Sequence, residues 1–229
     1  MRPRLQARVL SLAVALCALV PVAGAAQTYT PYSISMRSQQ FQPLPIPHPQ
    51  AGPVQDHSSI YAASYFNRIP INFPIRFFDQ DYQTLYVTGY GMIEFQDSGT
   101  WSYSNTVLPS TTTPNNGIIA PWWDDTYNSG GHIKSQILGQ APSRTLVVEW
   151  FVPHYYTYGG SIARFQVWLF EGSSTIEFHY GTIDPSTEWS ASIGIENPGG
   201  TVGYGVPVAN GTICNPSCGD AHWLTNTVV

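Results

Sequence analysis

The stretch SIARFQVWLFEGSSTIEFHY, residues 161–180, contains two strand-like segments and the turn between them. Large apolar side chains recur at every second position on both sides of the turn: Phe165, Val167 and Leu169, then Ile176, Phe178 and Tyr180. The intervening Glu171-Gly172-Ser173-Ser174 is short and rich in turn-forming residues. Alternation on both sides of such a turn predicts an antiparallel β-hairpin.

The same pattern recurs from about residue 60 to residue 204. A second hairpin is predicted at 82–96, where Thr88-Gly89-Tyr90-Gly91 turns the chain. Closely spaced strands without an amphipathic helix predict an all-β fold, an antiparallel β-sandwich or a partly closed barrel of about ten strands. Strands are expected near 60–66, 73–78, 83–88, 91–96, 118–122, 132–138, 144–151, 162–170, 175–180, 190–196 and 201–206.

Residues 1–26 have the layout of a secretory signal peptide. Three arginines precede an apolar run at 9–20, and Ala23-Gly24-Ala25 offers a cleavage site. The run is shorter than the roughly 20 residues that cross a bilayer. We therefore expect a cleaved signal and a chain that is secreted or held at the cell surface, with no membrane insertion of the mature part.

Residues 27–58 differ in composition from the rest of the chain. Alternating prolines favour an extended conformation and oppose helix and sheet pairing, so this region is expected to be a Pro-rich arm or linker. The β-sandwich domain is then expected to occupy residues 59–229. The prolines that carry this prediction stand at positions 43, 45, 47, 49 and 53.

The overall charge argues against some classes of partner. The formal net charge is −5, and Lys134 is the single lysine. A negative, lysine-poor surface is a poor match for nucleic acid or for an anionic membrane.

Two cysteines follow the predicted signal peptide, Cys214 and Cys218, and they are separated by Asn-Pro-Ser. An even pair in an exported chain favours a disulfide, and Asn-Pro favours the tight turn that would bring the two thiols together. We expect a disulfide-pinned loop near the C-terminus.

Trp122-Trp123-Asp124-Asp125 is the most suggestive polar-aromatic cluster. The two carboxylates could bind Ca²⁺, and no other cofactor is indicated. Exposed indoles beside carboxylates could instead bind a sugar, with the rings stacked on its C–H groups and the carboxylates accepting hydrogen bonds from its hydroxyls. In a third interpretation, the tryptophans alternate between the core and the surface, and the aspartates cap the following turn through side-chain hydrogen bonds.

Glu149 is the other candidate for chemistry. With Asp124 or Asp125 it could form the carboxylate pair of a carbohydrate-acting hydrolase. A cross-strand ion pair with Arg164 explains the same residue more simply. Glu177 and His179 alternate with apolar residues and are expected on a solvated or loop-covered outer face.

Tyr155, Tyr156 and Tyr158 lie in a predicted loop. Tyrosine offers rigid contact area and a hydroxyl group, which suits binding to protein or glycan surfaces. Packing of this loop on the domain is the structural alternative.

Several segments in order resemble the nidogen-like extracellular module and its bacterial secreted β-sandwich relatives. They are FPIRFFDQDYQTLYVTGYGMIEFQ (73–96), NNGIIAPWWDDT (115–126), RTLVVEWF (144–151), RFQVWLFEGSSTIEFHYG (164–181) and SASIGIENPGGTVG (190–203). The resemblance implies an extracellular β-structure with adhesive or matrix roles, and it supplies no catalytic residues.

The sequence therefore favours a secreted, non-catalytic cell-surface or matrix module that binds extracellular protein or polysaccharide. Two alternatives stay open: a secreted carbohydrate-acting hydrolase, and a coat or envelope subunit that self-assembles through exposed sheet edges.

Overall fold

The computed structural model describes residues 29–58, 66–97, 102–111, 116–126, 131–153, 161–184, 190–205 and 227–228. No helix in these ranges has the length and hydropathy to cross a membrane. The described chain is built from strands that pair antiparallel throughout. They are β1 (Arg37–Ser38), β2 (Gln55–Asp56), β3 (Phe66–Phe77), β4 (Gln80–Thr88), β5 (Ile93–Glu94), β6 (Ile118–Trp123), β7 (His132–Leu138), β8 (Thr145–Pro153), β9 (Ile162–Phe170), β10 (Ile176–Ile183), β11 (Ser192–Glu196), β12 (Gly203–Gly205) and β13 (Thr227–Val228).

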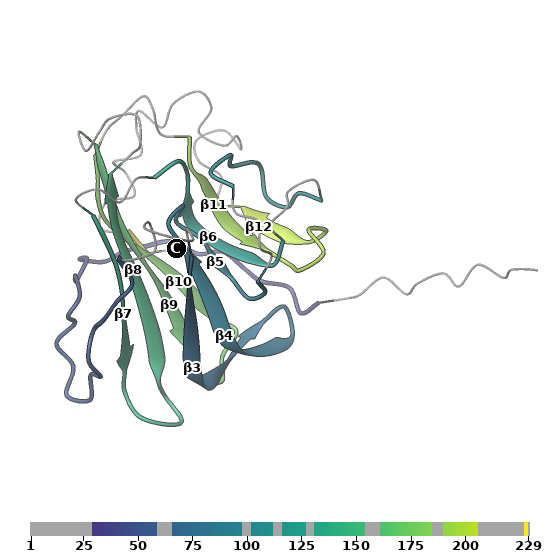
Figure 1. The fold of residues 1–229 in the computed structure, drawn as a ribbon. Helices are drawn as coiled ribbons and strands as arrows, with labels where there is room; N and C mark the ends of the chain where they lie inside the picture. The colour runs from purple at the N-terminus through teal and green to yellow at the C-terminus, as the bar shows by residue number, and fades with distance from the viewer. Residues whose placement is uncertain are drawn as a thin grey trace, which may run out of the picture.

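The strands form two facing sheets (Figure 1). One has the order β1-β13-β10-β9-β8-β7-β2, and the other has the order β12-β11-β6-β5-β4-β3. Both sheets are open, so the fold is the predicted antiparallel β-sandwich and not a barrel. Burial of the inner side chains of both sheets against each other is what holds such a sandwich together.

Both predicted hairpins are present. In the first, β9 pairs with β10 in the register that sets Leu169 opposite Ile176 and Phe165 opposite Tyr180. In the second, β4 pairs with β5, with Val87 opposite Ile93. The alternating side chains of β9 are fully buried, as the period-two pattern predicts: Phe165, Val167 and Leu169.

Strand β3 is longer than the sequence pattern predicted. Separate strands were expected near 60–66 and 73–78, whereas β3 runs as one strand from Phe66 to Phe77. Pro70 and Pro74 obscured it, because proline is excluded from central strands. Strand β3 lies at the edge of its sheet, where the missing N–H groups need no partner. The alternation is present in its buried residues: Ile69, Ile71, Phe73, Ile75 and Phe77.

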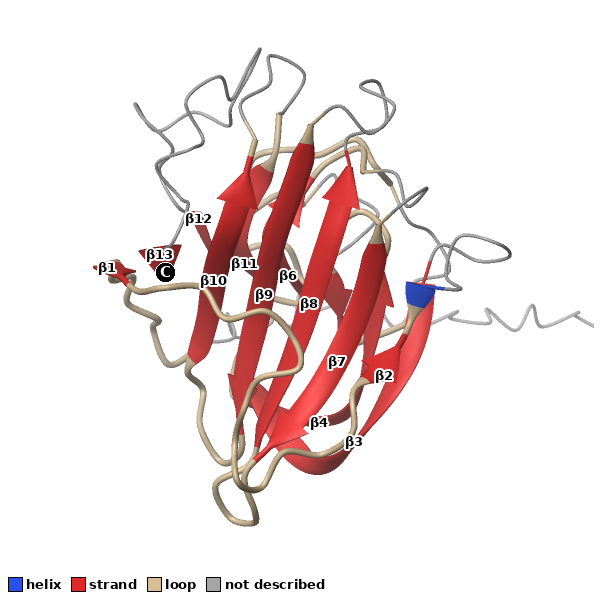
Figure 2. Ribbon diagram, turned by 90° about the vertical axis from the view of Figure 1, so that its left-hand side faces the viewer, coloured by secondary structure: helices blue, strands red, loops and turns tan. Residues whose placement is uncertain are grey.

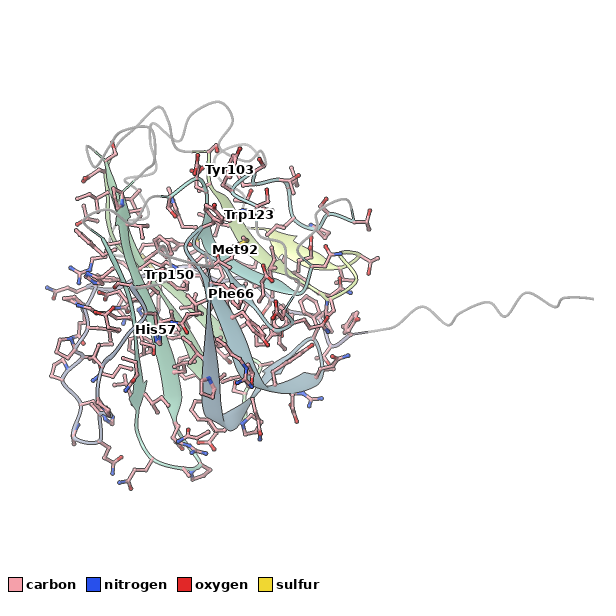
Figure 3. All side chains as sticks on the ribbon, in the orientation of Figure 1. His57, Phe66, Met92, Tyr103, Trp123 and Trp150 are labelled. Carbon is pink, nitrogen blue, oxygen red and sulfur yellow. The ribbon has the colours of Figure 1, made fainter. Side chains whose placement is uncertain are left out.

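The main core fills the space between the two sheets. Trp150 lies there, where its indole N–H donates to the Thr88 carbonyl at 3.0 Å and its ring stacks on Phe165 at 5.3 Å (Figure 3). This contact ties the seven-stranded sheet to the end of β4 in the six-stranded sheet. Satisfying the indole N–H removes the penalty that an unpaired buried donor would carry.

The Pro-rich segment does not hang free of the sandwich. It crosses the outer face of the seven-stranded sheet between β1 and β2 (Figure 2). Leu44 and Ile46 are buried there against Leu138, Val147 and the partly buried Trp168. Both faces of this sheet are therefore covered, which explains why so few residues of its central strands are exposed.

Candidate functional site

Strand β6 carries the Trp-Trp-Asp-Asp cluster, and a bulge decides where its side chains point. Ser192 of β11 lies opposite Trp123, but Gly194 lies opposite Ala120, so β6 has one extra residue in this interval. A β-bulge of this kind resets the side-chain alternation. Trp122 therefore joins the core between the sheets, whereas Trp123 lies on the outer face of the six-stranded sheet.

Neither indole is exposed. Trp123 packs with Met92 and Leu108, and its N–H donates to the Ser102 carbonyl at 2.8 Å (Figure 3). The segment at 102–111 thus covers the face on which Trp123 lies. The interpretation that required exposed tryptophans for sugar stacking is incorrect for this pair, because both rings have 0% exposure.

Asp124 caps the turn that follows β6. Its Oδ1 accepts the backbone N–H of Asp125 at 2.8 Å, and its Oδ2 accepts the backbone N–H of Ser190 at 2.8 Å. The Ser190 hydroxyl adds a third contact at 3.1 Å. The carboxylate therefore links the end of β6 to the segment that enters β11. This is the turn-cap geometry that the sequence offered as an alternative to Ca²⁺ binding.

The described residues contain no group of three or more His, Cys, Asp or Glu side chains placed to hold a metal ion. Asp125 is half-buried beside Asp124. An ion at this pair would have to compete with the three hydrogen bonds that Asp124 already accepts.

Asp124 should make the stability of the protein depend on pH. Burial raises its pKa to about 6 from an ordinary value of 3.8, although hydrogen bonds from Ser190 and Asp125 oppose the shift. The folded state then binds more protons than the unfolded state between these values, so this group's contribution weakens by about 3 kcal/mol as pH rises through that window. Denaturant unfolding at pH 4 to 8 measures this slope.

Asp124→Asn is the matched variant for that measurement. Between pH 4 and 6, the free energy of unfolding of this variant should fall less steeply with pH than that of the wild type, whatever the absolute stability of the variant. Glu196, whose pKa burial raises to about 7, contributes a slope of the same sign in both proteins. Identical slopes for wild type and variant would contradict the assignment.

Glu149 is fully buried and holds the Pro-rich segment on the sheet. Its Oε1 accepts from Arg164 at 2.8 Å and contacts His132 Nε2 at 3.2 Å. Its Oε2 accepts from the side-chain amide of Gln166 at 2.6 Å and from the backbone N–H of Leu44 at 2.9 Å. The predicted ion pair with Arg164 is confirmed, and the carboxylate has a structural role in the arrangement described.

Neighbouring side chains hold the same segment by the same means. Gln136 accepts the N–H of Ile46 at 2.9 Å and donates to the Gly52 carbonyl at 3.0 Å. Gln166 also donates to the Gln42 carbonyl at 2.8 Å. Because an extended proline-rich chain has few backbone partners of its own, these side chains supply its hydrogen bonds.

The outer face of β10 is covered and not solvated, which agrees with one of the two alternatives predicted for Glu177 and His179. His179 is buried, stacks on Trp168 at 4.5 Å and contacts Glu177 at 2.8 Å. Glu177 also forms an ion pair with Arg37 at 2.8 Å. Strand β13 pairs with β10 at His179 and continues the sheet to β1.

A groove of about 420 Å³ lies at the side of the sandwich where β10 of one sheet faces β11 and β12 of the other. Residues 31–37 form its third wall. The volume is within the range of about 300–1,000 Å³ that small-ligand sites occupy. Ile34 is 43% exposed and the Arg37 side chain is 53% exposed, so the groove opens to solvent along this wall.

Hydroxyl groups and one ion pair supply the polar part of the groove. The ion pair is Arg37–Glu177, and the hydroxyl side chains are Tyr32, Ser33, Ser35, Ser174, Thr175 and Tyr204. Sequence reasoning missed this site completely. Its walls come from segments as distant in the sequence as residues 31–37 and Tyr204, and none of them carries a motif of its own.

Three of the predicted site elements fall outside the residues that the structure describes: Tyr155, Tyr156 and Tyr158, the Cys214–Cys218 disulfide, and the signal peptide. The strand ends next to the tyrosines are described. Pro153 lies opposite Ile162, Asp184 donates its N–H to Ile162, and Ser192 lies opposite Trp123. Between the sheets, the Tyr180 hydroxyl donates to the Pro121 carbonyl near the end of β6 at 2.7 Å, and Tyr180 is in register with Trp150 near the end of β8. The ends of β6 and β8 therefore lie at the same end of the sandwich.

Comparison with known proteins gives one family. A family model described as NIDO related matches residues 31–217. This range includes every strand of the two sheets except β13, the prolines of the Pro-rich segment and the walls of the groove. Searches of curated proteins and of solved structures gave no significant match.

Proposed function

This chain belongs to the NIDO-related family, and from that membership together with the groove we propose that it is a secreted, non-catalytic module that binds extracellular protein or polysaccharide. The family indicates an extracellular module. We further propose that the chain is exported through the predicted signal peptide at 1–26 and is located in the matrix or at the cell surface.

The groove between β10, β11 and residues 31–37 is the observation that carries the proposal. It combines a ligand-sized volume, an opening to solvent and convergent polar groups, which are the usual features of a binding site. It also lies where two sheets and an anchored segment meet, so its shape is set by rigid elements on more than one side.

The roles of the two acidic candidates support a non-catalytic protein. Both oxygens of Glu149 already accept hydrogen bonds, from Arg164 and from the N–H of Leu44 in the Pro-rich segment. Both oxygens of Asp124 do the same, from the N–H groups of Asp125 and Ser190. A general acid or nucleophile needs an oxygen that can reach the substrate. In their present contacts these two carboxylates stabilise the fold, and neither lines the groove.

A sedimentation assay tests the proposed function. The secreted chain is mixed with the insoluble extracellular fraction of the producing cells, and bound and free protein are measured over a concentration series. We expect saturable retention without release of soluble sugar or peptide. Treating the fraction with protease or with periodate separates protein from polysaccharide as the target. A chain that stays in the supernatant, or one that releases product, would contradict the proposal.

A further inference from the structure

We propose that the ligand of the groove is a short segment of a neutral polysaccharide, held by hydroxyl groups and by an apolar wall. The inference rests on the proposed function and narrows it from protein or polysaccharide to one chemical class.

The charge of the groove favours an uncharged ligand. Arg37 and Glu177 are the charged residues of its lining, and they pair with each other at 2.8 Å. Because the pair is internally neutral, the groove offers no net charge to an anionic or cationic polymer. The chain as a whole carries −5, which further disfavours polyanions through long-range repulsion.

The hydroxyl lining matches a sugar. Each Ser, Thr or Tyr hydroxyl both donates and accepts hydrogen bonds, and sugar hydroxyls do the same, so either partner can adjust to the other. Ser33 and Ser35 stand on one wall, and Ser174 and Thr175 stand on another, all four exposed.

The apolar wall supplies the surface that the C–H groups of a sugar ring need. Tyr32 and Tyr204 meet at 5.7 Å between ring centroids with an interplanar angle of 61°, and Ile195 lies beside Tyr204 in the lining. Tyr204 is half-buried, so part of its surface stays accessible. An aromatic side chain with a hydroxyl tip serves both the apolar and the polar faces of such a ligand.

The wall at residues 31–37 is anchored before any ligand arrives. The turn between β3 and β4 places Phe78 at φ 44° and Asp79 at φ 61°, which is unusual for residues other than glycine. This turn receives the N-terminal segment: Asp79 accepts the N–H of Thr30 at 2.6 Å, and Phe78 donates its N–H to the Tyr32 hydroxyl at 3.2 Å. At the other end, Arg37 is held by Glu177. An anchored wall lowers the entropy lost on binding.

Calorimetric titration of the secreted chain tests the inference. The probes are cellohexaose, maltohexaose and N-acetyl-chitohexaose as neutral sugars, hexagalacturonate as an anionic sugar, and an uncharged unstructured decapeptide. We expect binding of at least one neutral hexasaccharide. Ser174→Trp and Ser35→Trp, which fill the groove from opposite walls at exposed positions, should each weaken that binding about tenfold or more. Gln83→Trp, at an exposed site on β4 away from the groove, is the matched control and should leave it unchanged.

Glu177→Gln adds a second measurement, the preference for an anionic over a neutral sugar. This preference would not change if Glu177 had a purely structural role. The substitution leaves the guanidinium of Arg37 without its carboxylate partner. The affinity for hexagalacturonate should therefore rise by up to about fivefold relative to the affinity for the neutral sugar. The gain should shrink at high salt, because the new attraction is between a surface charge and an anion.

The opposing outcomes are distinct. Absence of binding by all three neutral sugars overturns the inference, and so does binding that both groove variants leave intact. Binding of the decapeptide alone, lost in Ser174→Trp, overturns the sugar assignment while the proposed function stands. Failure of the wild-type chain to be retained in the sedimentation assay is the result that removes the proposed function itself.

Discussion

Gly91→Ala is expected to destabilise the sandwich by at least about 3 kcal/mol, the sum of backbone strain and overpacking. Gly91 has φ 76° in the turn between β4 and β5. A Cβ atom there would lie 2.0 Å from the carbonyl oxygen of Trp122 and 3.2 Å from the ring of Phe165. Because the first of these atoms belongs to the backbone of β6, relief requires the turn and β6 to move apart. Urea unfolding of wild type and variant measures the loss.

Gly172→Ala is the matched control for this prediction. Gly172 has φ 66° in the turn between β9 and β10, and a Cβ atom there would meet no atom within 4 Å. Only the cost of the left-handed backbone remains, about 1–2 kcal/mol. If the two variants lost the same free energy of unfolding, close packing of the Gly91 turn on β6 would not contribute to stability.

Glu149→Gln should cost about 3–5 kcal/mol, the loss expected when one partner of a buried ion pair is removed. The amide is neutral, and its NH₂ group would replace an oxygen that accepts hydrogen bonds, so Arg164, Gln166 or the N–H of Leu44 loses its partner. The Pro-rich segment should loosen first. Thermal unfolding and hydrogen exchange at Leu44 and Ile46 measure the two effects.

The pH dependence of Glu149 has the sign opposite to that of Asp124. Burial alone would raise the pKa of Glu149, but hydrogen bonds from His132, Arg164 and Gln166 outweigh it and hold the pKa below its ordinary value of 4.5. This stabilisation is present above pH 4.5 and is lost as pH falls through the folded-state pKa. Glu149→Gln should therefore flatten the acid limb of the stability curve.

Asp81→Asn is the control for the buried pair. Asp81 pairs with Arg76 at 3.1 Å, and both side chains are well exposed. Exposed pairs contribute about 0–1 kcal/mol. A loss as large in Asp81→Asn as in Glu149→Gln would show that burial is not what makes the Glu149 network important.

Alternation in the sequence was enough to predict much of the sandwich. The pattern at 161–180 predicted the β9–β10 hairpin and its buried face, and the turn at 88–91 predicted the β4–β5 hairpin. Glu149 and Arg164 stand on neighbouring strands that alternate in the same way, so their ion pair could also be inferred. These features are local or connect strands that are adjacent in the chain. The alternation of apolar side chains and the residues of the turns are therefore enough to predict them.

Only the tertiary structure decided what lies on the outer faces. Period-two alternation tells which residues share a face of a strand, but it does not tell whether another segment covers that face. The segment at 102–111 buries Trp123, and the Pro-rich segment buries Glu149, so two residues that looked available for ligands belong to the interior. The groove depends on the same kind of long-range contact. Its lining joins residues 31–37 to β10 and β11, which are distant in the sequence, and the hydroxyl groups that line it are unremarkable in the sequence.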